Sequence, residues 1–223
     1  MKTLVSWSSG KDSAWMVHVL RQTPGVALGG LLTTVNAAAG RVAMHAVRET
    51  LLQQQADALD LSLRLVPIPS PCSNEVYAQV MGDAVRAAVA DGFTHVAFGD
   101  LFLADIRAYR EQQLAGSGLT PLFPLFGADT PSLARQMLAA GLRARLTCID
   151  PRVLERRFVG REFDNALLAE FPATVDPCGE RGEFHSFAYD GPMFRRPIPV
   201  VAGEVVERDG FVFADLLPAD VAG

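Results

Sequence analysis

The sequence is poor in cysteine, with only Cys72, Cys148 and Cys178 among its 223 residues. These three are widely spaced and form no CxxC pair, so neither a disulfide framework nor a structural zinc site is indicated. Long apolar runs are also missing: none reaches the roughly 18 residues of a membrane span, and the N-terminal run is too short for a signal peptide. We therefore expect a protein of a reducing cytoplasm with no membrane partner.

A surplus of positive charge is absent as well. Twenty Lys and Arg residues stand against 25 Asp and Glu residues, and the resulting net charge of −5 argues against a nucleic-acid partner. Hydrophobic residues make up 49% and charged residues 20% of the chain, the balance of an ordinary globular protein. Its length suffices for one large domain or for a main domain with a smaller appendage.

What the sequence does contain is a repeated strand–helix pattern in its first half. Short apolar runs predict buried strands at residues 4–7, 26–35, 61–67 and 95–98, whereas helix-period stretches predict helices at 13–22, 45–59 and 74–90. The last of these helices should be capped at Ser73 or Asn74. Strands joined by crossovers of this length form parallel sheets, so we predict an α/β fold with a doubly wound, mostly parallel sheet.

The second half differs in composition. Glycine and proline cluster at residues 116–124, and a helix at 130–140 and a strand at 142–149 are expected beyond this cluster. Residues 204–213 predict a hairpin, because Asp209-Gly210 supplies the two turn positions with positive φ. We therefore place a boundary near residue 125 and expect a main domain at 1–125 and a smaller α+β portion at 126–223.

A polar loop at residues 8–13 separates the first predicted strand from the first predicted helix. Its small residues allow an anion to approach the backbone, and Gly10 permits conformations that other residues avoid. The free N–H groups of the helix, the charge of Lys11 and the hydroxyl groups of Ser8 and Ser13 favour a pyrophosphate-like group. The loop matches neither a Walker P-loop nor GxGxxG. The alternative is a loop that merely joins a strand to a capped helix.

A second candidate segment follows the strand at 95–98. Gly99-Asp100 ends this strand, and ligands of open α/β sheets gather at the carboxyl ends of strands, so the segment should lie beside the first loop if the two strands are neighbours. Arg107 and Arg110 share a helical face, which suits phosphate or carboxylate binding. The alternative is a solvated helix face on which both arginines pair with acidic neighbours, Asp105 and Glu111.

The densest cluster of functional side chains lies at residues 176–192. We expect Glu180 in a tight loop, and Glu183 and His185 on one face of the strand that follows. Such a group could orient ammonia or act as acid and base. Cys178 could form a metal site with Glu183 and His185, although their spacing matches no recognised motif. Alternatively, its thiol could be a nucleophile, or the residue could simply be small and packed.

Three motifs together resemble one known family. The loop SSGKDS resembles the SGGxDS signature of the PP-loop ATP pyrophosphatases, with Ser9 in place of its first glycine. GDLFLADIRAYRE at residues 99–111, and PCGERGEFHSF followed by DGP at 177–192, resemble motifs of the diphthine–ammonia ligase family, a branch of those enzymes. The motifs occur in the right order and cover nearly the whole chain, and the last is the most specific.

The resemblance implies a Rossmann-like fold of the adenine nucleotide α-hydrolase type and an AMP-forming amide ligase. ATP would be cut to AMP and pyrophosphate to adenylate a carboxylate, which ammonia then converts to an amide. The resemblance places the ATP site at Ser8, Gly10, Lys11, Asp12 and Ser13. To these we add Ser9, Thr33, Gly99, Asp100 and Arg107 as expected ATP contacts, and we expect Asp12 to be a ligand of Mg²⁺. Catalytic roles fall on Lys11, Asp12, Glu180, Glu183 and His185, and substrate contacts on Arg110, Cys178, Gly179 and Glu180.

The acceptor is the open part of this interpretation. In eukaryotes and archaea it is diphthine on elongation factor 2. This compact, alanine- and arginine-rich chain resembles a bacterial version, for which another carboxylate, a small molecule or a protein side chain, is expected. Two other functions stay open: a PP-loop tRNA-modifying enzyme, which would need reactive cysteines and a basic surface, and an ATP-binding sensor without turnover. A homodimer is one option for its assembly.

A few further residues have weaker signals. Trp7 is expected in the core of the sheet rather than under an adenine, and His18 and His95 are expected to be structural. His45 should open a helix as a cap or a partly exposed residue. The polar end of the second strand could face a ribose or a base; its residues are Thr33, Thr34 and Asn36.

Overall fold

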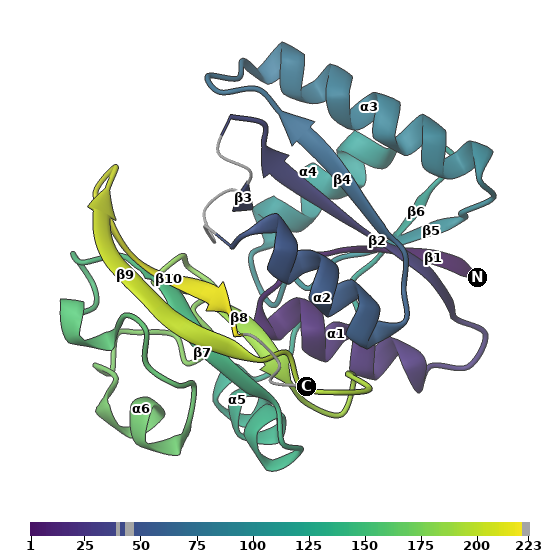
Figure 1. Cartoon of the computed structure of the whole chain (residues 1–223). Coiled ribbons are helices and arrows are strands. Elements are labelled where there is room, and N and C mark those ends of the chain that lie inside the picture. Colours follow the sequence, from purple (N-terminus) through teal and green to yellow (C-terminus); the bar gives the residue numbers. More distant parts are fainter. Residues whose placement is uncertain (39–40, 43–46, 220–223) are drawn as a thin grey trace.

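The computed structural model describes residues 1–38, 41–42 and 47–219, which form two sheets with associated helices (Figure 1). The first sheet has six strands in the order β3-β2-β1-β5-β6, with β4 also paired to β2, and every pair except β2–β3 is parallel. The strands are β1 (Lys2–Ser6), β2 (Ala27–Asn36), β3 (Arg41–Val42), β4 (Leu63–Ile68), β5 (His95–Ala97) and β6 (Thr120–Leu122). The predicted mostly parallel α/β sheet is confirmed.

Helices cover both faces of this sheet. Figure 1 shows α1 (Lys11–Arg21) and α2 (Glu49–Leu59) on the side of the second sheet, and α3 (Asn74–Ala90) with α4 (Ala104–Leu114) away from it. The predicted cap of α3 is confirmed, because the Ser73 hydroxyl accepts a hydrogen bond from the Val76 N–H. Helix α2 begins at Glu49, later than predicted, and His45 lies outside the described residues.

The second sheet is antiparallel, with the order β8-β7-β10-β9. Its strands are β7 (Arg143–Ile149), β8 (Phe184–Asp190), β9 (Val200–Arg208) and β10 (Phe211–Pro218), accompanied by α5 (Thr130–Ala139), the short 3₁₀ helix η1 (Arg156–Phe158) and α6 (Asn165–Glu170). The β9–β10 hairpin turns at Asp209 and Gly210, whose φ angles of 52° and 80° confirm the predicted turn.

Two details differ from the sequence prediction. The glycine- and proline-rich stretch contains strand β6, which pairs with β5 at the edge of the parallel sheet. The main hydrophobic core is also continuous from the first sheet to the second, with Val5, Leu51 and Phe187 all fully buried in one cluster. We therefore keep the boundary near residue 125 as a proposal about chain organisation, between two parts that share a core.

The opposite face of the parallel sheet is covered more thinly. A small cluster packs there under α3 and α4: Leu4, Ala88, Phe93, Val96, Leu114 and Leu119. Ala88 is the one buried residue of the 17-residue helix α3. This face therefore keeps space between sheet and helices, which matters for the site below. No helix of the described residues is long and apolar enough to span a bilayer.

Candidate active site

The loop at residues 8–13 joins β1 to α1 and is anchored to the second sheet. Ser9 is fully buried, and its carbonyl oxygen accepts hydrogen bonds from the Ala188 N–H and from Nε2 of Gln55, each at 2.9 Å. Its φ is 71°, in the left-handed region that favours glycine. Ser9 therefore has a backbone conformation that glycine adopts more readily, at the position where the resembled signature has its first glycine, and its own hydroxyl oxygen has no hydrogen-bond partner.

The remaining hydroxyl groups of the loop bind one another. The Ser8 and Ser13 hydroxyls lie 3.0 Å apart, and Ser13 also donates to the Gly10 carbonyl at 3.0 Å. The backbone N–H of Lys11 donates to the hydroxyl of Ser186 on β8 at 3.2 Å. These residues line a small polar cavity at the start of α1, the position at which anions bind to a helix N-terminus.

Lys11 is 1% exposed, and its ammonium group lies between the two candidate loops. It donates to Oδ2 of Asp12 at 2.9 Å and to the carbonyl oxygen of Cys178, and it lies over the Phe184 ring. Burial is the largest influence and lowers the pKa of Lys11, but the charge and hydrogen bond of Asp12 and the charges of other nearby groups together leave this pKa above its ordinary value. Lys11 is therefore a fixed positive charge.

Asp12 uses only one of its oxygens. Oδ2 accepts from Lys11, whereas Oδ1 is buried and has no hydrogen-bond partner. Burial raises the pKa of Asp12, and Lys11 opposes this change only in part. A buried carboxylate oxygen without a donor is costly, so Oδ1 is an acceptor available to a bound ligand or cation.

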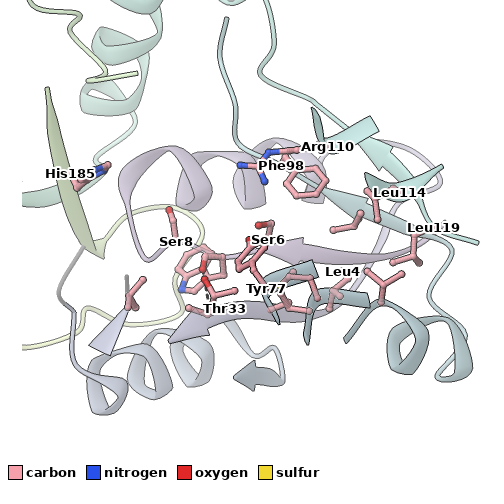
Figure 2. Close-up of a pocket in the computed structure, with 17 residues that line it drawn as sticks. Leu4, Ser6, Ser8, Thr33, Tyr77, Phe98, Arg110, Leu114, Leu119 and His185 are labelled. Carbon is pink, nitrogen blue, oxygen red and sulfur yellow. Dashed lines mark hydrogen bonds between the residues drawn. The ribbon is translucent and has the colours of Figure 1, made fainter. Parts of the chain in front are cut away.

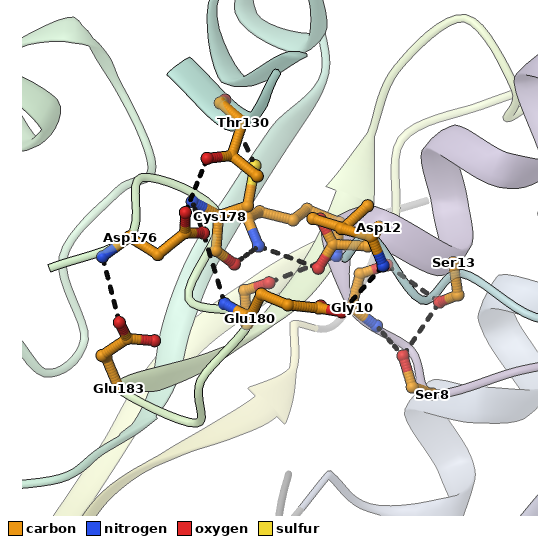
Figure 3. Close-up of polar contacts among 12 residues, drawn as sticks. Ser8, Gly10, Asp12, Ser13, Thr130, Asp176, Cys178, Glu180 and Glu183 are labelled. Atoms are coloured by element: carbon orange, nitrogen blue, oxygen red, sulfur yellow. Dashed lines mark hydrogen bonds and ion pairs between the residues drawn. The ribbon is translucent and has the colours of Figure 1, made fainter. Parts of the chain in front are cut away.

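The second loop, residues 176–183, is held in shape by two carboxylates (Figure 3). Asp176 accepts from the backbone N–H groups of Cys178 and Glu180 and from the Thr130 hydroxyl, the last at 2.6 Å. Glu183 accepts from the N–H groups of Asp176 at 3.0 Å and Arg181 at 2.9 Å. Both side chains therefore organise the loop from inside.

Gly179 shows why this loop is so specific in sequence. Its φ is 74°, and an added Cβ would lie 2.9 Å from the Phe184 ring and carbonyl oxygen. The neighbouring Cys178 thiol is buried and donates to the Thr130 carbonyl oxygen at 3.6 Å. Because burial raises the pKa of Cys178, the group stays a neutral thiol, and the nucleophile considered from the sequence is not supported.

Glu180 connects this loop to the segment after β5. Its Oε1 accepts from the backbone N–H groups of Leu101 at 2.7 Å and Phe102 at 3.4 Å. Burial raises its pKa above the ordinary glutamate value. Gly99 lies close to the start of α1: a Cβ atom added at Gly99 would lie 3.4 Å from the backbone of Asp12. The condition for this segment to lie beside the first loop is met, because β1 pairs with β5.

The two arginines of α4 have different surroundings. Arg110 donates from Nε and Nη2 to both oxygens of Asp100, at 2.6 and 3.1 Å, and stacks 4.4 Å above the Phe98 ring. Arg107 pairs with Glu111 at 2.9 Å and stacks on two phenylalanines that do not line the site, Phe123 and Phe126. Arg107 lines neither cavity of the site and forms the ion pair with Glu111 that the alternative described. A contact of Arg107 with the nucleotide stays a prediction.

His185 lies where two cavities meet. Burial, and to a lesser degree the charge of Lys11, lowers the pKa of His185 to about 4, so its imidazole is neutral at physiological pH. Glu183, two residues earlier, does not share its surroundings, because its carboxylate is bound by loop amides. The expectation that both act from one strand face is wrong: the strand begins at Phe184, and Glu183 belongs to the loop.

Two adjoining cavities make up the site. The polar one, about 270 Å³, is lined by residues of both loops and of the segment after β5: Ser8, Gly10, Lys11, Asp12, Ser13, Gly99, Asp100, Arg110, Cys178, Gly179, Glu180, His185 and Ser186 among others. The larger one, about 370 Å³, runs between the sheet and α3, from Ser8 and Thr33 at one end to Leu114 and Leu119 at the other (Figure 2). Both volumes suit parts of a small-molecule ligand.

The larger cavity contains residues that sequence reasoning placed there and others that it missed. Thr33 lines it and donates to the Trp7 carbonyl oxygen at 2.8 Å, while Trp7 is buried and donates to Gln55, as expected for a core residue. Tyr77 and Met81 of α3 had no signal in the sequence. In the polar cavity, the sequence prediction also missed Ser186, although this residue lies within the C-terminal motif.

A resident metal cluster is not part of this arrangement. Within residues 1–38, 41–42 and 47–219, no group of three or more His, Cys, Asp or Glu side chains could hold a metal ion. The site considered for Cys178, Glu183 and His185 does not form, because the thiol donates to the Thr130 carbonyl oxygen of α5 and the carboxylate accepts from loop amides.

Comparisons with known proteins agree with the motifs. Residues 129–214 match the family described as the diphthamide synthase C-terminal domain. A diphthine–ammonia ligase of Schizosaccharomyces pombe is 32% identical over 95 residues, which are 41% of this chain and 16% of that protein. A diphthine–ammonia ligase of Homo sapiens is 26% identical over 177 residues, 73% of this chain and 66% of that protein. The chain thus spans less than two thirds of either relative.

One solved structure is also similar to this chain. It is described as a predicted subunit of tRNA methyltransferase from Methanocaldococcus jannaschii, and the alignment covers 89% of this chain and all of the other, at 17% identity and a TM-score of 0.43. A similarity of this size supports no inference about the site.

Proposed function

We propose that this chain, which belongs to the diphthine–ammonia ligase family, is an ATP-dependent, AMP-forming amide ligase. It would cleave ATP between the α- and β-phosphates, adenylate a carboxylate and let ammonia displace AMP. One observation carries the proposal: the loop at 8–13 and the loop at 176–183 meet in one polar cavity, which opens into a cavity of nucleoside size.

The two cavities suggest how ATP lies. Five residues line both of them, Ser6, Ser8, Phe98, Arg110 and His185. The larger cavity is mostly apolar, with the hydroxyls of Thr33 and Thr34 at its polar end, and suits adenine and ribose. The polar cavity at the start of α1 suits the phosphates, because helix N–H groups and Lys11 stabilise negative charge. The α-phosphate would then lie at the junction.

The charges of the polar cavity fit a Mg²⁺ ion beside the phosphates. Its side chains include three carboxylates, Asp12, Asp100 and Glu180, whereas its two cations, Lys11 and Arg110, are already paired. Mg²⁺ is commonly held by one or two carboxylates together with phosphate oxygens. The unpartnered Oδ1 of Asp12 makes this residue the first candidate ligand. When bound, the ion would neutralise charge on the phosphates.

In the first step, an oxygen of the acceptor carboxylate attacks the α-phosphorus, and the bond to the β-phosphate oxygen breaks. Negative charge then grows on the departing pyrophosphate. The N–H groups at the start of α1 and the buried ammonium of Lys11 are fixed in place before the reaction, so they stabilise this charge without rearrangement. The products of this step are an acyl adenylate and pyrophosphate.

In the second step, ammonia attacks the acyl carbon and AMP leaves with the carboxylate oxygen bound to its phosphorus. The attacking nitrogen must lose a proton. Glu180 is the better acceptor, because its pKa is raised and two backbone N–H groups fix its carboxylate. His185, with a pKa of about 4, stays neutral and would orient the groups at the junction by hydrogen bonding.

The experiment is product identification with labelled ATP. The protein is incubated with ATP, Mg²⁺, ammonium and a panel of carboxylates, and we expect AMP and pyrophosphate. Asp12→Asn should reduce AMP formation at least a hundredfold, whereas Asp83→Asn, on the exposed face of α3, should not change it. Formation of ADP and phosphate, or full activity of the Asp12 variant, would contradict the proposal. Binding of ATP without any AMP would favour the sensor alternative.

A further inference from the structure

A third cavity of about 260 Å³ forms a groove between α3 and α4. Its walls are mainly apolar and come from both helices, with Phe98 directly after β5 and Ser117 after α4. Arg86 and Arg110 also line it, beside the apolar and aromatic residues Tyr77, Met81, Val85, Tyr109 and Leu114. No motif in the sequence pointed to it. The groove is separate from the loops at 8–13 and 176–183, none of whose residues line it.

Two aromatic residues that line this groove are exposed by more than a third, Tyr77 by 38% and Tyr109 by 49%. Exposed aromatic side chains around an apolar groove are typical of a binding site. Helix α3 buries only Ala88, so its inner face is available to a ligand rather than filled by its own core.

The groove also contains a cation fixed at its inner end. Arg110 and Phe98 line the groove and both cavities of the proposed ATP site. Arg110 donates two of its five N–H groups to Asp100, and its stacking on Phe98 holds the guanidinium plane. Three donors remain for an anionic group of a ligand. A carboxylate is the anion that the proposed reaction requires at this junction.

We infer that the groove between α3 and α4 binds the acceptor of the proposed ligase, and that this acceptor is a carboxylate on an apolar arm. The carboxylate would accept hydrogen bonds from Arg110 next to the α-phosphate. The arm would lie along Ala78 and Gly82 toward Tyr109, because Tyr77, Met81 and Val85 also line the cavity proposed for the nucleoside. This inference rests on the proposed function, because it assigns the second substrate to a place beside the proposed ATP site. Short or highly polar acids would leave the apolar walls uncovered.

The test measures binding of an acid series to the protein with Mg²⁺ and α,β-methylene ATP, by ligand-observed NMR titration. The probes are acetate, butanoate and hexanoate, with hexan-1-ol as the same arm without the anion. Burial of each methylene should tighten binding about fourfold, so hexanoate should bind roughly tenfold or more tighter than butanoate. Hexan-1-ol should bind at least tenfold more weakly than hexanoate.

Two variants locate the binding. Ala78 is exposed and lines the groove, whereas Ala87 is exposed on the same helix and does not line it. Ala78→Trp should weaken hexanoate binding at least tenfold without changing the affinity for the ATP analogue, and Ala87→Trp should bind as the unaltered chain does. Sedimentation of all three proteins shows whether the groove is covered by a second copy.

The outcomes separate this inference from the proposed function. Failure of the ATP analogue to bind contradicts the proposed function itself. If the analogue binds, equal affinity for all acids, no binding of any acid, or unchanged binding by Ala78→Trp overturns the groove assignment alone. If the protein is a dimer and Ala78→Trp dissociates it, the groove is an interface between two copies, and this result too would overturn the groove assignment.

Discussion

The ammonium group of Lys11 donates to the carbonyl oxygen of Cys178, 167 residues further along the chain. This contact joins the loop that follows β1 to the loop that precedes β8, and the Phe184 and Phe163 rings exclude water around it. The cation that would face the phosphates is therefore also a structural link between the two halves of the site. Its removal should affect stability as well as activity.

Lys11→Met should destabilise the fold by about 3–5 kcal/mol, because it leaves the carboxylate of Asp12 buried without its charged partner. Equilibrium unfolding in urea measures this loss. The double variant with Asp12→Asn should recover a large part of the stability but none of the AMP formation. Equal stability of the single and double variants would show that the carboxylate of Asp12, left without its charged partner, does not cause the loss.

Ser9→Gly should stabilise the protein by about 1 kcal/mol. It relieves a left-handed φ of 71°, which costs a non-glycine residue about 1–2 kcal/mol, and removes a buried hydroxyl without a partner. The greater flexibility of glycine in the unfolded chain offsets part of this gain. Thermal unfolding is the measurement, with Ser8→Gly as a control that should destabilise because the Ser8 hydroxyl is hydrogen-bonded. A lower melting temperature for Ser9→Gly would contradict the strain argument.

Asp215 should make the free energy of unfolding depend on pH. Burial alone would raise its pKa, but hydrogen bonds from Arg41 and Arg48 outweigh burial and hold the pKa of Asp215 at about 2. Its ordinary pKa is about 3.9, so the stabilisation is present above about pH 4 and is lost as the pH falls toward 2. Asp215→Asn should cost about 1–2 kcal/mol at pH 6, after allowance for solvent screening, and nearly nothing at pH 2.

Chemical unfolding at several pH values measures the Asp215 effect. Asp209→Asn is the matched control, because Asp209 is an aspartate of the same hairpin with a side chain 86% exposed. A stability difference for Asp215→Asn that persists unchanged from pH 6 to pH 2 would contradict the assignment of the ion pair.

Glu180→Gln should separate the two chemical steps. A glutamine oxygen can still accept from the N–H groups of Leu101 and Phe102, so the loop should keep its shape. Exchange of pyrophosphate into ATP should persist, whereas amide formation should fall by roughly a hundredfold, as expected for a lost general base. In the unaltered protein, the rate of amide formation should rise with pH. The midpoint of this rise should lie above the ordinary pKa of glutamate, because burial raises the pKa of Glu180.

Glu183→Gln is the comparison for this prediction. Its carboxylate binds the N–H groups of Asp176 and Arg181, so its loss should loosen the loop and reduce both steps together. If Glu180→Gln reduced pyrophosphate exchange and amide formation equally, Glu180 would not be the proton acceptor and would only position other groups.

Much of the fold could be predicted because its signals are local. The cap at Ser73 and the turn at Asp209-Gly210 depend on a few neighbouring residues, and the alternation of strands and helices depends on short periodic stretches. Strand β6 was missed because a three-residue strand in a glycine- and proline-rich stretch has no periodicity of its own. Its pairing with β5 is a tertiary effect.

The site was predictable in its motifs but not in the division of roles within them. Arg107 and Arg110 share a helical spacing, yet only Arg110 meets Phe98 and Asp100, which fold beside it from the preceding strand. Glu180 and Glu183 occur in one motif, and only the closed loop shows which carboxylate is bound by its own backbone. The groove between α3 and α4 had no sequence signal, because it arises from sparse packing of α3.

Transfer of oxygen from the acceptor to AMP tests the central claim most directly. With hexanoate, or another acid that supports turnover, labelled with ¹⁸O in its carboxylate, the reaction with ATP, Mg²⁺ and ammonium should place one ¹⁸O atom in AMP for each amide formed, as mass spectrometry of AMP would show. Unlabelled AMP together with amide, or ¹⁸O in orthophosphate with ADP as the other product, would contradict an acyl adenylate at the junction of the two cavities.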